Sequence, residues 1–388
     1  MKNPNVTHEN WDVPPYNRWA LQNMDQIVKT APISRGDGPI YHLSRSECNV
    51  DDLPLFRVDG SAATVKDVLD STYTDGFLVL HKGSIICEQY FNDMESNTRH
   101  LSQSMAKSIT ATLAGVYVGK GLIDTGLLVS HYVPQLSQCG YEGATVQQVL
   151  DMRSGVRFIE DYSDLENEMF YLDRASGWKP RHDKSFPSTI YDFILTLVKD
   201  REHGLDFSYR SIETEIIAWI CEKVGGDKVP ALYAKEIWSK LGAEHDALFT
   251  VDSDGTPLAD GGFNATLRDY GRFGLMQLYE GKFNGNQIVP QAWVKSCKTG
   301  DQEVFRHGGT SMLEFYPDAC YSNQWWVLDR DKGIFSARGA NGQLIYMDPM
   351  HELVVVKLSS QPEFINDEMA YDTQRAINAI TEHIMPDL

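Results

Sequence analysis

The chain has 388 residues, of which 42% are hydrophobic and 23% are charged, as is usual for a globular protein. This length exceeds what one compact core usually holds, so we expect one large domain or two of moderate size. The formal net charge of −19 argues against a nucleic-acid partner, because binding to a phosphate backbone requires a basic face.

The N-terminus and the cysteines bear on the cellular compartment. The first residues, MKNPNVTHENWDVPPYNRW, contain no apolar run and predict neither a signal peptide nor a lipoprotein anchor. No stretch approaches the roughly eighteen apolar residues of a membrane span. The six cysteines are scattered without a C-x-x-C pair, which favours free thiols in a reducing environment. We therefore expect a cytoplasmic protein without a membrane partner.

The first half of the chain shows an arm, a hairpin and a helix. Residues 1–55 are polar and lack periodicity, so we expect an irregular N-terminal arm that wraps around the body. The stretch GFLVLHKGSIICEQYF, from Gly76, has two apolar runs around a tight turn and predicts a β-hairpin. Next comes HLSQSMAKSITATL, from His100, whose apolar residues recur at helical spacing and predict an amphipathic helix.

Strand-like runs occupy both ends of the remaining chain, and helical patterns occupy its middle. We expect residues 124–265 to form a mostly helical inserted domain, and 56–123 together with 266–388 to form an α/β domain. The run ELVVVKLS is so apolar that it predicts a central strand buried on both faces. The predicted fold class is α/β, in the α+β sense, with a central antiparallel sheet flanked by helices.

Several motifs of metal, nucleotide and hydrolase chemistry are missing. The eleven histidines form no H-E-x-x-H, and the chain contains no P-loop and no G-x-G-x-x-G that opens a helix. The G-x-S-x-G elbow of α/β-hydrolases is also missing. We therefore expect no metal and no cofactor.

The remaining motif is an S-x-x-K pair, Ser104 and Lys107, at the front of the predicted helix. Residues i and i+3 lie about 60° apart on neighbouring turns, so the amine can reach the serine oxygen. A serine needs a base to become a nucleophile, and lysine becomes one only when its pKa falls well below about 10.4. The small and apolar residues SITATLAG that follow favour burial of Lys107. On the tetrapeptide alone, a helix-start serine beside a solvated lysine remains the simpler interpretation.

A second S-x-x-K match, Ser176 and Lys179, lies between proline and glycine residues in a predicted loop. No helical face orients these two side chains, so we do not assign chemistry to them.

Three stretches carry a resemblance to a known family: SQSMAKSITATLAG, TVQQVLDMRSGV and DYGRFGLMQLYEGKFNGNQIVPQAWVKS. In this order, after a hairpin, they resemble the serine β-lactamase and penicillin-binding-protein superfamily. The chain is most similar there to class C β-lactamase-like esterases and to 6-aminohexanoate-dimer (nylon oligomer) hydrolases. The resemblance runs from about Gly76 to the C-terminus. It implies a β-lactamase-like fold and a metal-independent serine hydrolase with Ser104 as nucleophile and Lys107 as its base.

That superfamily has a Y-x-N or Y-x-S after the nucleophile and a K-T-G-like strand later. The literal matches, YSN at 321–323 and KTG at 298–300, occur in the wrong order and are interpreted as coincidences. The better match is YRS, which begins at Tyr209. The resemblance implies that Tyr209 relays the proton of Ser104 to the leaving group. Ser211 replaces the usual asparagine at the substrate and is a natural N-cap for the next helix.

The stretch SARGANGQLIY aligns with the K-T-G strand. The resemblance then places the N–H of Ala340 as the second oxyanion-hole donor, beside the N–H of Ser104. Gly339 allows the strand to come close to the substrate. Ala337 stands where the family has lysine, a residue that β-lactamases place near the substrate carboxylate. This departure weakens the case for turnover of penicillins or cephalosporins.

Residues 157–173, RFIEDYSDLENEMFYLD, correspond in the family to a loop over the active site. Tyr162 resembles a tyrosine that nylon-oligomer hydrolases place over the substrate, and Asp173 lies where an acid can meet a substrate ammonium group. The other acids of this loop are interpreted as a solvated face: Glu160, Asp161, Asp164, Glu166 and Glu168. If they line the mouth of the site, they favour amine-bearing substrates.

The predicted function is hydrolysis of a small-molecule linear amide, such as a 6-aminohexanoate dimer, or of a carboxylic ester, through an acyl-enzyme on Ser104. One alternative is a β-lactamase or D-Ala-D-Ala carboxypeptidase. Another is a non-catalytic binding protein with the same fold. A homodimer is compatible with the sequence.

Overall fold

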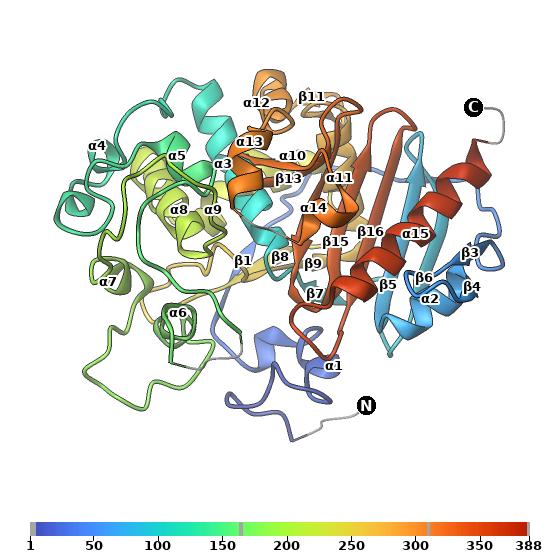
Figure 1. Ribbon diagram of the computed structural model, residues 1–388, viewed down its shortest axis with the longest axis horizontal. Coiled ribbons are helices and arrows are strands. Elements are labelled where there is room, and N and C mark those ends of the chain that lie inside the picture. The colour runs from blue at the N-terminus through green and yellow to red at the C-terminus, as the bar shows by residue number, and fades with distance from the viewer. Residues whose placement is uncertain (1–4, 163–165, 309–310, 386–388) are drawn as a thin grey trace.

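The computed structural model describes residues 5–162, 166–308 and 311–385. Its centre is a sheet of eight strands that come from both ends of the chain (Figure 1). In sheet order they are β12 (Cys320–Ser322), β13 (Trp325–Asp329), β14 (Ile334–Gly339), β15 (Gln343–Asp348), β16 (Leu353–Ser359), β5 (Thr74–His81), β6 (Ser84–Tyr90) and β2 (Ser44–Arg45). Neighbouring strands are antiparallel apart from β2 and β6, which are parallel. The predicted fold class is confirmed.

The strand predicted to be buried on both faces is β16, and every one of its residues is buried. Its side chains alternate between two cores, as the two-residue period of a strand requires. Val354 and Val356 belong to the core under helices α3 (Met105–Gly119) and α11 (Leu267–Leu278). Val355 belongs to the core under α2 (Val65–Ser71) and α15 (Asp367–Ile384), on the opposite face (Figure 1).

Residues 124–265 hold most of the short helices, as expected, but they also contribute two strands. The strands β8 (Ala247–Thr250) and β9 (Phe263–Thr266) join β1 (Thr30–Ile33) and β7 (Arg99–Leu101) in a four-stranded antiparallel sheet. The helical part of the chain is thereby attached to the strand that leads into α3. The division into an inserted domain and an α/β domain at 123/124 and 265/266 stays a prediction.

The N-terminal arm is more regular than predicted. It contains helix α1 (Asn17–Ala20), supplies strands to both sheets and buries Trp11 and Leu21. Its first part, with α1, lies along the lower edge of the view, below the helical part and the large sheet (Figure 1). The polar composition of the arm did not predict these contacts, because only a few of its side chains are buried and these are enough to hold the arm in place.

Apart from α8, which has 14 residues, the remaining elements are short. The helices are α4 (Val129–Tyr132), α5 (Val146–Leu150), α6 (Glu168–Ser176), α7 (Ile190–Ile194), α8 (Ile212–Gly225), α9 (Val229–Tyr233), α10 (Ser239–Leu241), α12 (Gln291–Ser296), α13 (Gln302–His307) and α14 (Met312–Phe315). The other strands are β3 (Pro54–Phe56), β4 (Ala62–Thr64), β10 (Lys282–Phe283) and β11 (Asn286–Gln287), the 3-10 segments are η1 (Met24–Gln26), η2 (Pro134–Gln138) and η4 (Ala340–Gly342), and η3 (Ala234–Trp238) is a π-helical segment. Across the described residues, no helix combines the length and the apolar character that a membrane crossing requires.

Candidate active site

Ser104 lies where strand β7 turns sharply into helix α3. Gln103 makes this turn with a φ of 48°, a left-handed conformation that costs roughly 1–2 kcal/mol for a non-glycine residue. Ser104 occupies the N-cap position, but its side chain caps no backbone N–H and so stays available. Residues 105–117 of α3 are all buried, so the helix is not amphipathic as predicted but passes through the interior.

Lys107 lies one turn into α3 and is 1% exposed. Its Nζ donates to the Oγ atoms of Ser104 and Ser211, both at 2.9 Å. The same ammonium group lies 3.3 Å from Oδ2 of Asp260. The predicted proximity of Ser104 and Lys107, and the predicted burial of the lysine, are present in the structure.

The charge of Lys107 differs from the expectation. Burial lowers its pKa, but the nearby Tyr209 phenol and the carboxylates of Asp260 and Glu160 outweigh burial, so the pKa lies above its usual range. The prediction of a lowered lysine pKa is therefore wrong for the resting site. Lys107 is an ammonium ion that bridges two serine hydroxyls.

Tyr209 stands beside this pair on the loop before α8. Its phenol lies within interaction range of Ser104 and Lys107, and Lys107 Nζ lies 5.0 Å from the centre of its ring. The ring stacks on Trp326, with 5.2 Å between centroids and 25° between planes. Burial raises the pKa of the phenol, and the Lys107 cation acts in the opposite direction. Tyr209 is a neutral phenol held against the nucleophile.

Ser211 lies behind Lys107 and not against the substrate as expected. It is fully buried, and its side chain does not cap α8. Its Oγ donates to Oε1 of Glu160 at 3.0 Å, and its N–H donates to Oε2 at 2.7 Å. Glu160 therefore faces inward, which corrects the interpretation of its loop as a solvated face. Of the other loop acids, Asp161 and Glu166 are exposed, and Asp164 lies outside the described residues.

The end of β14 comes against the backbone of Ser104. A Cβ on Gly339 would lie 2.5 Å from the carbonyl oxygen of Ser102 and 3.0 Å from the nitrogen of Ser104, so only glycine allows this approach. Ala340 follows as the first residue of η4. In the described part of the chain, neither the Ser104 N–H nor the Ala340 N–H has a protein acceptor. Both predicted oxyanion-hole residues, Ser104 and Ala340, line the same cleft.

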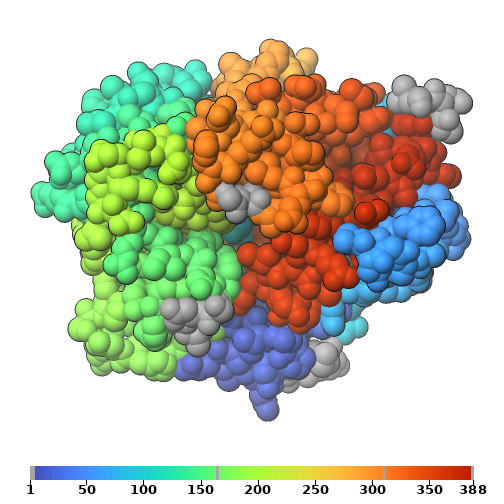
Figure 2. Space-filling view, in the orientation of Figure 1, coloured from blue at the N-terminus to red at the C-terminus, as the bar shows by residue number. Residues whose placement is uncertain are grey.

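Ser104 lines a cleft of about 380 Å³, within the usual range of small-molecule sites. The segments around it meet in the middle of the face shown in Figure 2, where green, orange and red surfaces adjoin. Tyr162 and Gly339 line this cleft, as predicted for substrate-binding residues. Tyr162 stacks on Phe364 with 5.1 Å between ring centroids and donates to Glu160 at 2.7 Å.

Asp173 lines a second, smaller cavity of about 20 Å³ that also reaches Ser104. Asp173 is 7% exposed, and within the described residues its Oδ1 has no hydrogen-bond partner. Burial, reinforced by the charge of Asp260, raises its pKa well above the usual range. Trp11 and Asp12 of the N-terminal arm form part of the same wall. This cavity has room for one small polar group.

The literal K-T-G and Y-x-N matches and the second S-x-x-K match lie away from the cleft. The residues of 298–300 and 321–323 do not line the cleft, and Asn323 instead accepts from Gln147 and donates to Asp151. Ser176 ends helix α6 and does not lie in a loop as predicted, and Lys179 pairs with Asp12 and not with Ser176.

Two acidic residues near Lys107 were not predicted from the sequence. Asp260 contacts Lys107 from 153 positions away in the chain, and no local pattern marked it. Glu215 accepts from the N–H of Asp260 at 2.8 Å, and burial beside that charge raises the pKa of Glu215 well above its usual range. The one available signal was its position inside the apolar helical run SIETEIIAWI.

Comparisons with known proteins agree with this geometry. A model of the beta-lactamase family matches residues 62–379. The 6-aminohexanoate-dimer hydrolase of Paenarthrobacter ureafaciens is 35% identical over 385 residues, which cover 96% of this chain and 95% of the relative. A solved structure described as a "putative 6-aminohexanoate-dimer hydrolase from Bacillus anthracis" superposes with a TM-score of 0.91 at 30% identity, over 100% of this chain and 98% of that one.

More distant structures share the fold alone. A class C beta-lactamase in complex with cefoxitin has a TM-score of 0.58 at 15% identity, over 81% of this chain and 98% of that one.

The fold and these comparisons define a hydrolytic enzyme of β-lactamase-like architecture. The chain belongs to the beta-lactamase family, and among the relatives it is similar to 6-aminohexanoate-dimer hydrolases. The resemblance inferred from the S-x-x-K region is confirmed.

Proposed function

We propose that this enzyme hydrolyses linear amides of the 6-aminohexanoate-dimer type, and short carboxylic esters less well, through an acyl-enzyme on Ser104. The observation that carries the proposal is the contact of the Ser104 hydroxyl with both the Lys107 ammonium and the Tyr209 phenol at one cleft. The assigned chemistry needs no metal and no organic cofactor.

The reactive form of the site has one proton fewer than the resting form. Once the Lys107–Tyr209 pair has released a proton, the Lys107 ammonium stabilises the Tyr209 phenolate. The phenolate takes the proton of Ser104 as its Oγ bonds to the substrate carbonyl carbon, and the N–H groups of Ser104 and Ala340 receive the oxyanion. Tyr209 then gives the proton to the departing amine or alcohol. Water then attacks the carbonyl carbon of the acyl-enzyme while Tyr209 takes its proton. Tyr209 returns that proton to Ser104 Oγ as the acid product leaves, which frees Ser104.

The acids around Ser104 support an amine-bearing acyl group. Asp173 and Asp260 line the small cavity beside the nucleophile, and Glu160 lines the main cleft. A substrate ammonium group placed there gains the attraction of the Asp260 and Glu160 carboxylates, supplies a donor to the unpaired Oδ1 of Asp173 and, by its own charge, favours the ionised form of Asp173. The relative named above acts, by its name, on a dimer of an ω-amino acid, which has such a group.

The β-lactamase and D-Ala-D-Ala carboxypeptidase alternative has less support. At the position of the family's strand lysine, Ala337 is fully buried and offers no charge to a β-lactam carboxylate.

A rate panel tests this proposal. We expect kcat/KM to be highest for the linear 6-aminohexanoate dimer, lower for p-nitrophenyl butyrate and lowest for nitrocefin. Ser104→Ala should lower all activity by about a thousandfold or more, because the residues of such a site act as a unit. Nitrocefin turnover that equals turnover of the dimer, or activity that survives in Ser104→Ala, would refute it.

We also propose a cytoplasmic location and a homodimer. All six cysteines are free thiols, which is consistent with a reducing compartment. Cell fractionation and analytical ultracentrifugation test these two points.

A further inference from the structure

Arg338 is a charged residue of the cleft to which the sequence analysis assigned no function. It lies on β14 directly before Gly339 and is half-buried. Of the described residues that line the cleft, it is the only lysine, arginine or histidine. It is therefore the positively charged residue of this cleft, in a protein whose net charge is negative.

The guanidinium group of Arg338 is held in place by neutral oxygens. Its Nε donates to Ser336 Oγ at 3.2 Å, and Nη2 donates to the Tyr316 hydroxyl at 3.1 Å. That hydroxyl donates in turn to Gln374 at 2.7 Å, so it accepts from Arg338 with a lone pair. Across the described ranges, no carboxylate oxygen lies within 4.0 Å of Arg338. A fixed, half-buried guanidinium without a counter-ion is a site for a carboxylate.

The position of Arg338 identifies which part of the substrate it meets. Ser336 pairs across the sheet with Trp326, so their side chains share a face, and Arg338 lies two residues further along that same face. Trp326 stacks on Tyr209. One continuous surface therefore connects Tyr209 to Arg338. Since Tyr209 gives its proton to the leaving group, the leaving group lies along this surface.

Carboxyl groups lie at the small cavity beside the nucleophile, which Arg338 does not line. Asp173 and Asp260 line the small cavity, Arg338 lines only the main cleft, and Ser104 lines both. Glu160 and Asp367 also line the main cleft, Asp367 as an exposed residue on the first turn of α15, but both carboxylates lie beyond ion-pair distance of the guanidinium. The two cavities together complement a zwitterion with its cleaved bond between the charges.

We infer that Arg338 binds a carboxylate on the leaving group. The preferred substrates are then amides whose departing amine ends in a carboxylate. This inference rests on the proposed function, because it uses Tyr209 as the proton donor to the leaving group.

Two substrates with the same acyl group separate this inference from the hydrolase chemistry. In one the leaving amine ends in a carboxylate, and in the other it ends in the matching primary carboxamide. We expect wild-type kcat/KM to be about tenfold or more higher for the acid, mainly through KM, since charge-assisted hydrogen bonds are roughly twice as strong as neutral ones.

Variants locate the preference. Arg338→Gln should reduce the acid-to-carboxamide ratio to about one, and Arg338→Lys should leave an intermediate ratio because it keeps the charge without the fork. Arg330→Gln, at an exposed arginine on the turn after β13, should keep the wild-type ratio.

A wild-type ratio near one, or an unchanged ratio in Arg338→Gln, would overturn the inference. The wild-type ratio needs no variant and therefore does not depend on whether Arg338→Gln folds. Turnover of p-nitrophenyl butyrate, which has no leaving-group carboxylate, reports the Ser104 chemistry separately. If the wild type does not hydrolyse this ester, the result contradicts the proposed function. If the wild type hydrolyses the ester but does not prefer the acid over the carboxamide, the result contradicts only the role of Arg338.

Discussion

Lys107 shows how burial and charge compete at a single residue. Burial alone lowers a lysine pKa, but three acidic neighbours reverse that direction here. The same environment affects Tyr209, whose pKa is raised by burial and by the charge of Glu160. The site therefore rests in its protonated form and becomes reactive when a proton leaves.

Glu160→Gln tests this account through the pH dependence of activity. Removal of the Glu160 charge lowers the pKa of both Lys107 and Tyr209, so the reactive form persists to lower pH. We expect the acid limb of the kcat/KM profile to move to lower pH. Glu168→Gln, at the start of α6, is the control and should keep the wild-type profile. A limb that stays in place or moves to higher pH would contradict the assigned charges.

The pairing of Ser104 with Lys107 was predictable, because i and i+3 positions on a helix are neighbours whatever surrounds them. The charge of Lys107 was not, because Asp260 and Glu160 come from distant loops. The sequence also could not predict that Arg338 has no ion-pair partner among the described residues, because this depends on all the residues that surround it in the cleft.

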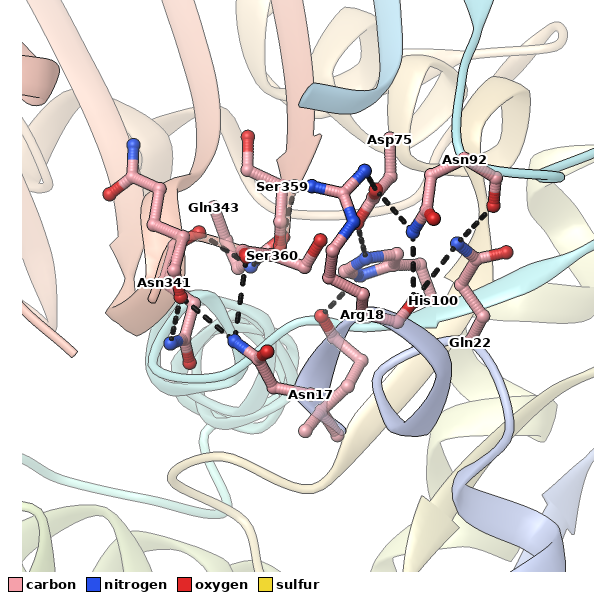
Figure 3. A network of polar contacts seen from close by, with 12 residues as sticks. Asn17, Arg18, Gln22, Asp75, Asn92, His100, Asn341, Gln343, Ser359 and Ser360 are labelled. Atoms are coloured by element: carbon pink, nitrogen blue, oxygen red, sulfur yellow. Dashed lines mark hydrogen bonds and ion pairs between the residues drawn. The ribbon is translucent and has the colours of Figure 1, made fainter. Parts of the chain in front are cut away.

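At the scale of elements, two turns are joined across the site. Gln103 and Asn341 both have left-handed backbones, with φ of 48° and 57°, and Gln103 Nε2 donates to Asn341 Oδ1 at 3.2 Å. Asn341 also donates to the carbonyl of Gln361 at 2.9 Å, and Asn17 of α1 donates to the same carbonyl at 2.9 Å (Figure 3). These contacts fix the start of α3 against the end of β14.

Asn341→Gly should affect catalysis more than binding. Glycine keeps the left-handed backbone but removes the bridge to Gln103, so the N–H groups of Ser104 and Ala340 lose their fixed separation. We expect kcat to fall about 10- to 100-fold with a smaller change in KM, since small misplacements of donors are costly. Asn284→Gly, at a left-handed asparagine in the β10–β11 turn, is the matched control. A change confined to KM would argue against the bridge.

Across the whole molecule, Lys357 is a buried ionisable group in the centre of the large sheet. It is fully buried on β16, donates to the Thr72 carbonyl at 3.3 Å and contacts Ser359. Burial lowers its pKa to about 7, although Asp75 acts in the opposite direction. Below pH 7 both folded and unfolded chains carry this proton, and the folded chain bears the full cost of the buried charge.

Stability should therefore rise with pH above neutrality. Between about pH 7 and 10 the unfolded lysine is protonated and the folded one is not, so this residue raises the free energy of unfolding by up to about 1.4 kcal/mol per pH unit. Lys357→Met should remove that rise and be most stabilising, relative to wild type, at pH 6. Denaturant unfolding at several pH values measures this, with exposed Lys184→Met as control. A constant difference between wild type and Lys357→Met across pH would contradict it.

Much of the large sheet was predictable, because its strands are marked by local apolar runs. The small sheet was not, since it pairs Thr30 with Thr250, and short local patterns carry no information on such distant partners. The arm that contributes Trp11 to the cavity wall was hidden by its polar composition for the same reason.

The most direct test of the central claim is detection of the acyl-enzyme. Wild-type enzyme is mixed with the linear 6-aminohexanoate dimer, quenched in acid within the first turnover and analysed by intact mass and peptide mapping. We predict a mass increase of one 6-aminohexanoyl group, located on Ser104 and missing in Ser104→Ala. Dimer hydrolysis without any such adduct on Ser104, under conditions where a fluorophosphonate also fails to label it, would contradict the account.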